Sequence, residues 1–108
     1  MRASPCGECW KSPTNLGMET ARRYRIRGRV QGVGYRYFTQ RIALRLGVRG
    51  WVRNLPNGDV EVHAEADSVT LANFREELER GPGSSAVDAV TEEGVTRTDR
   101  YSSFEIRG

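Results

Sequence analysis

The sequence predicts an α+β domain in which strands and helices follow the order βαββαβ, with a short strand added at the end. Several short segments alternate hydrophobic with polar residues, which is typical of half-buried strands. Two longer segments carry hydrophobic residues three or four positions apart, which is typical of helices. Turns that contain glycine or proline separate the segments. This order is typical of a ferredoxin-like split βαβ sandwich, with an antiparallel sheet and two helices on one face.

The first strand and the first helix are expected on either side of a glycine-rich turn. Between residues 22 and 30, arginines alternate with mostly hydrophobic residues, which predicts a strand with Tyr24 on its buried side. Residues 31–34 interrupt this alternation, and hydrophobic residues then recur at helical spacing. These residues are Tyr35, Phe38, Ile42 and Leu46. The helix is expected to stop at Gly47, because glycine commonly ends a helix.

Residues 48–53 and 59–66 are predicted as the second and third strands, joined by an Asn-Gly turn at residues 56–58. In a split βαβ sheet the third strand lies beside the first, so Glu61 and Glu65 are expected to face the arginines of the first strand. Those arginines are Arg23, Arg25, Arg27 and Arg29. Opposite charges across a strand pair contribute about 0.2–1 kcal/mol each, so this pairing stabilises the predicted sheet.

The second helix and the last strands complete the predicted domain. The helix is expected to begin at a cap formed by Asp67 or Ser68 and to end at the Gly-Pro-Gly sequence of residues 81–83. Residues 87–95 and 101–107 are predicted as the last two strands. The buried side of the helix is expected to carry Leu71, Phe74 and Leu78.

Residues 1–20 are expected to form a flexible extension before a domain of residues 21–108. The extension is rich in proline, glycine and serine and shows neither helical nor strand periodicity. Met18 is an alternative start, which leaves a chain of 108 − 17 = 91 residues. Cys6 and Cys9 have the spacing of a redox or zinc motif, but no second pair accompanies them. They are therefore interpreted as thiols of the extension.

Length and composition indicate a single soluble domain. The chain has 108 residues, of which 37% are hydrophobic and 29% are charged. It contains no apolar run of about 18 residues that would predict a membrane span, and its first residues lack the apolar stretch of a secretory signal. Two cysteines do not make a disulfide-rich scaffold. We therefore expect a cytoplasmic protein with no membrane partner. A monomer is expected, although the sequence leaves the oligomeric state open.

The net charge of +3 conceals a strong asymmetry between the two halves of the chain. Residues 1–58 carry twelve basic and two acidic residues, whereas residues 59–108 carry five basic and twelve acidic residues. A basic half can indicate a nucleic-acid partner or a small anionic substrate. Because the two sets of charges fall on neighbouring predicted strands, pairing within the fold is preferred, and no nucleic-acid partner is expected.

The glycine-rich turn from Gly28 to Arg36 is the first candidate functional segment. It leads from a strand into a helix N-terminus, where free N–H groups and the helix dipole favour an anion. Glycines let successive N–H groups converge on that anion, and the Arg36 guanidinium can hold two phosphate oxygens. The residues predicted to bind phosphate are Gln31, Gly32, Val33, Gly34, Tyr35 and Arg36. A Walker loop and a dinucleotide fingerprint both fit less well, and a plain strand-to-helix connection is the alternative.

Asn54, at the end of the second predicted strand, is the second candidate. It shares the parity of Val48, Gly50 and Val52, which places it on the helix-covered face of the sheet. The split βαβ topology can bring this strand end close to the glycine-rich turn. A neutral amide there can orient a water molecule without repelling an anion. The alternative is that Asn54 is only a turn residue before Pro56.

The segment Val30-Gln31-Gly32-Val33-Gly34-Tyr35-Arg36, together with Gly50-Trp51-Val52-Arg53-Asn54, resembles the acylphosphatase family. The resemblance covers roughly residues 20–107 and implies hydrolysis of the carboxyl–phosphate bond of small acyl phosphates. It implies that Arg36 binds the phosphate with the amides of residues 31–36, and that Asn54 positions the attacking water. Many members end in an aromatic residue, where this chain ends in Gly108. We expect no metal and no cofactor, because the sequence shows no cluster of metal ligands.

Three alternatives stay open. RNA-binding modules share the βαββαβ order, but they stack bases on aromatic residues of the central strands, which the third predicted strand lacks. The family also resembles the N-terminal domain of a hydrogenase-maturation carbamoyltransferase. That domain belongs to a long chain and this chain stops, so a stand-alone enzyme is preferred. His63 is expected to be a solvated strand residue, with a phosphohistidine role as the alternative.

Overall fold

The computed structural model describes residues 19–83, 85–98 and 100–107. The predicted extension of residues 1–20 lies outside this part of the chain except for its last two residues, and so do Met18, Cys6 and Cys9. The elements are β2 (Thr20–Arg29), α1 (Tyr35–Leu46), β3 (Arg49–Asn54), β4 (Val60–Ala66), α2 (Ser68–Arg80), β5 (Ala86–Val95) and β6 (Phe104–Arg107). Within the described ranges, neither helix is long and apolar enough to cross a membrane.

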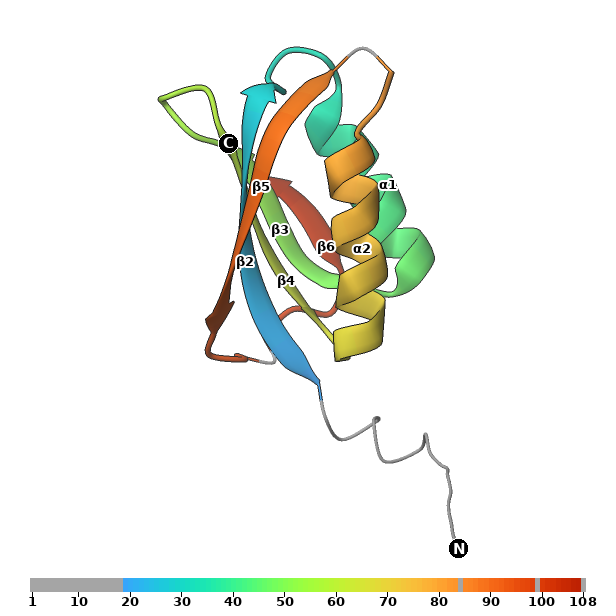
Figure 1. Cartoon of the computed structure of the whole chain (residues 1–108). Helices are drawn as coiled ribbons and strands as arrows, with labels where there is room; N and C mark the ends of the chain where they lie inside the picture. The colour runs from blue at the N-terminus through green and yellow to red at the C-terminus, as the bar shows by residue number, and fades with distance from the viewer. Residues whose placement is uncertain (1–18, 84, 99, 108) are drawn as a thin grey trace, which may run out of the picture.

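The five strands form one sheet in the order β5-β2-β4-β3-β6. Both helices cover the same face of this sheet (Figure 1), so the predicted ferredoxin-like α+β class is confirmed. The pairs β2–β4 and β3–β4 are antiparallel, as predicted, and the β2–β5 pair is antiparallel as well. The β3–β6 pair is parallel, with Gly50 opposite Phe104. The sheet is therefore mixed, because the chain leaves β5 at one edge and enters β6 at the other edge in the direction of β3.

The core lies between the sheet and the two helices. Tyr24 of β2 and Leu71, Phe74 and Leu78 of α2 are buried, as their spacing predicts. The Phe74 ring makes edge contacts with the Tyr24 ring at 5.9 Å and with the Phe104 ring at 6.1 Å between centroids. Burial of each large side chain of this kind stabilises the fold by about 1.5–3 kcal/mol. The aromatic contacts thus join α2 to the centre of the sheet and to its last strand.

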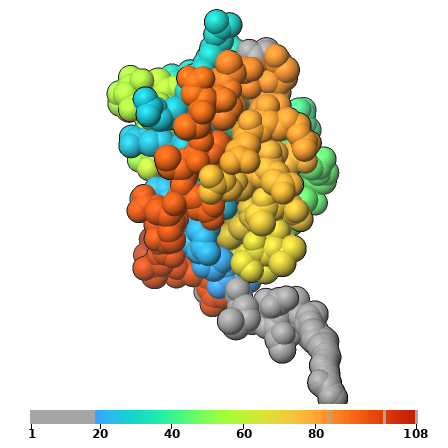
Figure 2. Space-filling model, viewed as in Figure 1, coloured from blue at the N-terminus to red at the C-terminus, as the bar shows by residue number. Residues whose placement is uncertain are grey.

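Polar contacts fix α2 at its start and along its side. Asp67 caps the helix, because its Oδ1 accepts a hydrogen bond from the Thr70 N–H at 2.8 Å. The Arg75 guanidinium donates to Glu92 of β5 at 2.6 Å and to the Val90 carbonyl at 3.1 Å. In the space-filling view, the yellow-orange surface of α2 adjoins the orange surface of β5 (Figure 2). The second helix is therefore held against the edge strand as well as against the core.

The helix-free face of the sheet is partly covered by its own chain. The predicted solvated state of His63 is wrong, since this residue is only 4% exposed. Its ring stacks on Trp51 at 5.8 Å and meets the Tyr101 ring at 5.5 Å. The Trp51 indole N–H also donates to the Tyr101 hydroxyl at 3.1 Å. The segment between β5 and β6 buries His63, because this segment crosses the sheet to reach the opposite edge.

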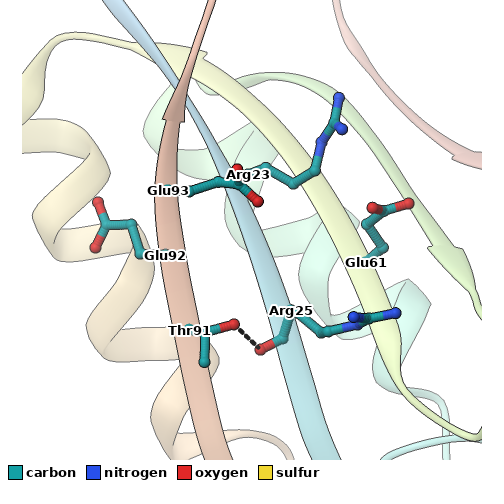
Figure 3. Close-up of a pocket in the computed structure, with 6 residues that line it drawn as sticks. All are labelled: Arg23, Arg25, Glu61, Thr91, Glu92 and Glu93. Carbon is teal, nitrogen blue, oxygen red and sulfur yellow. Dashed lines mark hydrogen bonds between the residues drawn. The ribbon is translucent and has the colours of Figure 1, made fainter.

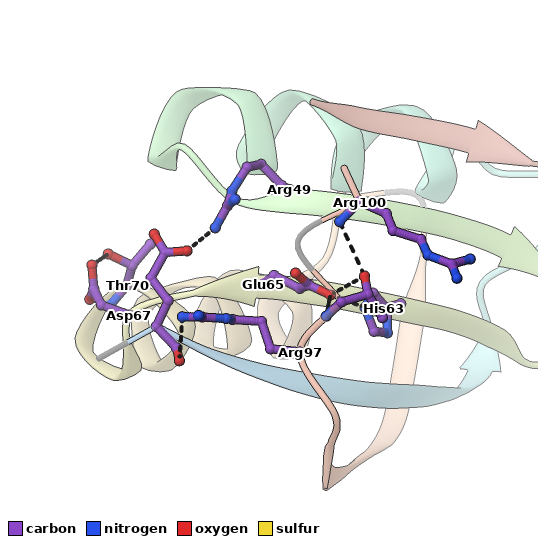
Figure 4. A network of polar contacts seen from close by, with 9 residues as sticks. Arg49, His63, Glu65, Asp67, Thr70, Arg97 and Arg100 are labelled. Carbon is purple, nitrogen blue, oxygen red and sulfur yellow. Dashed lines mark hydrogen bonds and ion pairs between the residues drawn. The ribbon is translucent and has the colours of Figure 1, made fainter. Parts of the chain in front are cut away.

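Glu65 anchors that crossing segment. Its carboxylate, which lies beside His63 in Figure 4, is fully buried. It accepts hydrogen bonds from the Thr98 N–H at 3.1 Å and the Thr98 hydroxyl at 3.0 Å. The same carboxylate oxygen lies 2.8 Å from Nε2 of His63. A buried carboxylate needs such partners, because an unpaired one costs several kcal/mol. In the strand register Glu65 lies opposite Ala21 rather than opposite an arginine of the first strand, which differs from the prediction.

Charge pairing within the fold is confirmed, although the partners differ from those predicted. Arg25 pairs with Asp59 at 3.3 Å. Glu61 lies opposite Arg25 in the strand register but pairs with Arg53 of β3 at 2.6 Å. Glu61 can pair with β3 instead of β2 because it lies opposite an arginine on each of these strands, Arg25 of β2 and Arg53 of β3.

Candidate active site

The topology brings the two candidate segments to one end of the sheet. Strands β2 and β3 both pair antiparallel with β4, so they run in the same direction on either side of it. Their C-terminal ends therefore lie at the same end. Residues 30–34 connect the end of β2 to α1, and Asn54 is the last residue of β3.

The connecting loop has a backbone suited to an anion. Gly32 and Gly34 adopt φ values of 75° and 80°, in the left-handed region that favours glycine. Helix α1 begins after Gly34 with no side-chain cap, and its first turn holds no acidic residue. The first N–H groups of a helix have no partner within the helix, and the helix dipole places a partial positive charge there. The start of α1 therefore has an electrostatic character that suits an anion.

A cavity of about 80 Å³ lies at this helix start. Arg36 and Asn54 both line this cavity. Four other residues of the two sequence motifs also line it. The complete lining is Val30, Gly32, Gly34, Tyr35, Arg36, Tyr37 and Asn54. A cavity of this volume holds a few water molecules. It therefore suits a group no larger than a phosphoryl group. Among these described lining residues, none carries a carboxylate or an imidazole.

Arg36 contributes the positive side chain of the cavity. It lies in the first turn of α1, and its Nη1 donates to the carbonyl of Arg107 at 3.3 Å. Within residues 19–83, 85–98 and 100–107, no carboxylate lies within ion-pair distance of its guanidinium. The charge of Arg36 is therefore not neutralised by those residues, and the contact with Arg107 fixes one end of the guanidinium.

Asn54 contributes a neutral oxygen. Its Oδ1 atom is buried and accepts no hydrogen bond from the described residues. Such an orphaned acceptor costs about 1–3 kcal/mol unless a donor reaches it. A water molecule in the adjoining cavity can supply that donor, and the position on the helix-covered face agrees with the parity of β3.

Two predicted loop residues have side chains that do not line the cavity. The side chain of Val33 packs against the core. The Gln31 amide turns toward the β3–β4 hairpin, where its Nε2 donates to the carbonyls of Leu55 at 2.7 Å and Asp59 at 2.8 Å. The local pattern contains no signal for this contact, because it depends on the position of a hairpin more than 20 residues away. Tyr37 lines the cavity and was not predicted.

The family model of acylphosphatases matches residues 22–106 of the chain, which includes the loop, Arg36 and Asn54. The chain belongs to the acylphosphatase family. An acylphosphatase of Solibacter usitatus is 48% identical over 96 residues, which cover 89% of this chain and 99% of that protein. An acylphosphatase of Thermotoga maritima is 44% identical over 87 residues, which cover 81% and 96% of the two chains.

The fold comparison agrees with the sequence comparison. The structure of an acylphosphatase from Coxiella burnetii superimposes with a TM-score of 0.79 and 37% identity, over 82% of this chain and 93% of that chain. Membership in the acylphosphatase family confirms the resemblance carried by the two motifs. It also confirms the expectation of an enzyme that hydrolyses acyl phosphates.

A second cavity, of about 210 Å³, lies on the helix-free face of this acylphosphatase-family chain. Figure 3 shows Arg23 and Arg25 of β2 extending toward β4, with Glu61 beside them. The six lining residues carry both signs of charge, and they are Arg23, Arg25, Glu61, Thr91, Glu92 and Glu93. Carboxylates in the same cavity repel an anion. The described lining of the cavity at the start of α1 holds no carboxylate, so that cavity suits an anion better.

The helix-free face does not present Trp51 as a platform for nucleic-acid bases. Trp51 is 6% exposed, and the guanidinium groups of Arg53 and Arg107 lie over its ring at 5.1 and 5.2 Å from the centroid. A base stacks on an exposed aromatic ring. The structure therefore offers no support at this residue for the RNA-binding alternative.

Proposed function

We propose that this enzyme hydrolyses small acyl phosphates to a carboxylate and inorganic phosphate at the cavity beside α1. In this proposal the backbone amides of residues 31–36 and the Arg36 guanidinium hold the phosphoryl group, and Asn54 orients the attacking water. The observation that carries the proposal is the shared cavity, which places a cation and a neutral acceptor next to one helix start.

Phosphate capture follows from the charges at the loop. The helix start offers N–H donors, and the planar Arg36 guanidinium can hold two phosphate oxygens at once. Each charge-assisted hydrogen bond contributes about 1.5–3 kcal/mol. Two such bonds that strengthen as charge develops on the phosphoryl oxygens account for about 10²- to 10⁴-fold in rate.

The reaction needs little further assistance, because an acyl phosphate is a mixed anhydride with a good leaving group. The buried Oδ1 of Asn54 accepts a hydrogen bond from water and directs the water oxygen at the phosphorus atom. The new P–O bond forms as the bond to the carboxyl oxygen breaks, and the carboxylate leaves with the electron pair. The water proton passes to a phosphate oxygen of the substrate. In-line geometry and charge stabilisation carry most of the rate of such a transfer.

We further propose that the reaction uses no metal ion. In the part of the chain that the structure describes, no three His, Cys, Asp or Glu side chains are grouped to hold one. Activity should therefore persist in excess EDTA, measured as phosphate release from acetyl phosphate. Loss of activity on chelation, with recovery when a divalent metal is restored, would refute this part of the proposal.

The purified chain tests the proposal directly. Phosphate release is measured by a colorimetric assay with benzoyl phosphate, with acetyl phosphate and with a phosphate monoester as the control. We expect hydrolysis of both acyl phosphates and little hydrolysis of the monoester, because none of the described lining residues carries a carboxylate, thiol or imidazole that could assist a poorer leaving group. Equal rates with the monoester, or no hydrolysis of either acyl phosphate, contradict the proposal.

A further inference from the structure

We propose that Gln31 is a positioning residue that sets the distance between the phosphate-binding loop and Asn54. The inference rests on the proposed function of that site. Gln31 belongs to the loop after β2, but its side chain donates two hydrogen bonds to the β3–β4 hairpin. It therefore links the segment that holds the phosphoryl group to the segment that holds the water.

The two acceptors lie directly beside Asn54. Leu55 follows Asn54 in the chain, and Asp59 precedes Val60, the partner of Asn54 in the strand register. The hairpin is closed at this point by a bond from the Leu55 N–H to the Asp59 carbonyl at 2.8 Å. Gln31 donates to the carbonyls of both residues that this bond joins, Leu55 and Asp59. A shift of the loop relative to the hairpin must therefore break at least one of these bonds.

The chemistry of the side chain suits this position. A glutamine amide has two N–H donors on one nitrogen, and two carbonyl oxygens lie 2.7 and 2.8 Å from it. A carboxylate of the same shape has no donor and would repel both oxygens. A thioether of similar length fills the space without donating. The residue does not line the cavity, so it acts through the segments that it joins.

The expected effect is on turnover rather than on phosphate binding. Reacting atoms must approach to about 3–3.5 Å in line, and a misplacement of about 1 Å can lower the rate about 10²-fold. The loop amides and Arg36 stay on one segment when the link is lost, so the phosphate keeps most of its contacts. The water held by Asn54 is on the other segment and loses its alignment.

The test compares Gln31→Met and Gln31→Glu with a matched control, Gln40→Met. The Gln40 amide of α1 also joins two segments, through one bond to the Phe104 carbonyl at 3.1 Å. We expect Gln31→Met to lower kcat about 10-fold or more, with the inhibition constant of inorganic phosphate within about twofold of wild type. Gln31→Glu should lower kcat further. Gln40→Met should keep kcat within about twofold, with a comparable shift of the urea midpoint.

A double-mutant cycle with Asn54→Ala separates positioning from general damage. If Gln31 acts by aligning the Asn54 water, Gln31→Met should lower kcat much less in the Asn54→Ala background than in wild type. The inference is overturned if Gln31→Met lowers kcat by the same factor in both backgrounds, or if it leaves kcat unchanged. Either result leaves the proposed function intact. An unchanged kcat for Asn54→Ala alone instead overturns the proposed water site, and the Gln31 inference with it.

Discussion

Arg36 and Asn54 line the same cavity, although Arg36 lies in the first turn of α1 and Asn54 is the last residue of β3. They meet because β2 and β3 run in the same direction on either side of β4. One side chain brings a positive charge that described carboxylates do not neutralise, and the other brings a neutral buried oxygen. The two residues have different parts in the proposed reaction, so their variants should differ in a measurable way.

Replacement of Arg36 should weaken both phosphate binding and turnover. We expect Arg36→Ala to lower kcat/KM for acetyl phosphate about 10²- to 10⁴-fold and to raise the inhibition constant of inorganic phosphate. Arg36→Lys should recover part of the loss, because it keeps the charge but not the two-pronged geometry. The exposed Arg41 of the same helix is the control, and Arg41→Ala should retain activity. Unchanged phosphate inhibition in Arg36→Ala contradicts this assignment.

Replacement of Asn54 should lower turnover more than phosphate binding. In Asn54→Ala the water loses its acceptor, so kcat should fall about 10-fold or more, while the inhibition constant of phosphate changes little. Asn54→Asp keeps the shape but adds a negative charge beside the phosphate, so it should also weaken phosphate binding. Steady-state kinetics with phosphate as a product inhibitor measure both quantities. A variant with normal kcat and weakened phosphate binding would assign Asn54 to binding instead.

The backbone at Gly34 should matter for activity beyond its effect on stability. Gly34 and Gly47 both adopt left-handed φ values, 80° and 78°, and a methyl group at either position would meet no atom within 4 Å. Alanine at each should therefore lower the free energy of unfolding by a similar amount, about 1 kcal/mol. Only Gly34→Ala should also lower kcat/KM. Both variants are measured by steady-state kinetics and by urea unfolding. A similar kcat/KM in the two variants would show that the loop backbone does not contribute to the site.

Stability should fall at alkaline pH because of a buried tyrosine. Burial raises the pKa of the Tyr35 hydroxyl above its usual value of about 10. The hydroxyl donates to the Leu78 carbonyl at 2.7 Å near the end of α2, where helix carbonyls lack helix partners. Above about pH 10 the unfolded chain loses this proton and the folded chain keeps it, so the free energy of unfolding decreases as pH rises.

Tyr35→Phe isolates that contribution. It should lower the free energy of unfolding near neutral pH by about 1–3 kcal/mol, because the Leu78 carbonyl loses its donor. It should also show a smaller decrease between about pH 10 and 12 than the wild type, since one of the two buried hydroxyls whose pKa burial raises, those of Tyr24 and Tyr35, is gone. Urea unfolding at several pH values measures both effects. If the free energy of unfolding decreases equally in the two proteins, a group other than Tyr35 causes the loss of stability at alkaline pH.

The sequence predicted those features that depend on neighbouring residues. The ends of both helices and the buried residues Leu71 and Phe74 follow from local spacing, and the structure confirms them. The cap of the second helix was predicted at Asp67 or Ser68, and the structure places it at Asp67. The shared cavity of Arg36 and Asn54 followed from the strand order, because that order determines which strand ends meet.

Three features depend on contacts between distant segments and could not be read from local patterns. The parallel β3–β6 pair requires the chain to cross the sheet after β5. The same crossing buries His63 against Trp51 and Tyr101, although its strand parity predicts exposure. The Gln31 link needs two carbonyls that only the folded hairpin places together.

The most direct measurement is a titration of the ¹⁵N-labelled protein with inorganic phosphate, followed by amide chemical shifts. Phosphate is the product and represents the phosphoryl group of the substrate. We predict that the largest shifts fall on the amides of residues 31–36, that the Asn54 side-chain amide also shifts, and that Arg36→Ala weakens the response. Shifts centred on Arg23 and Arg25 of the helix-free face, with the start of α1 unchanged, would contradict this prediction.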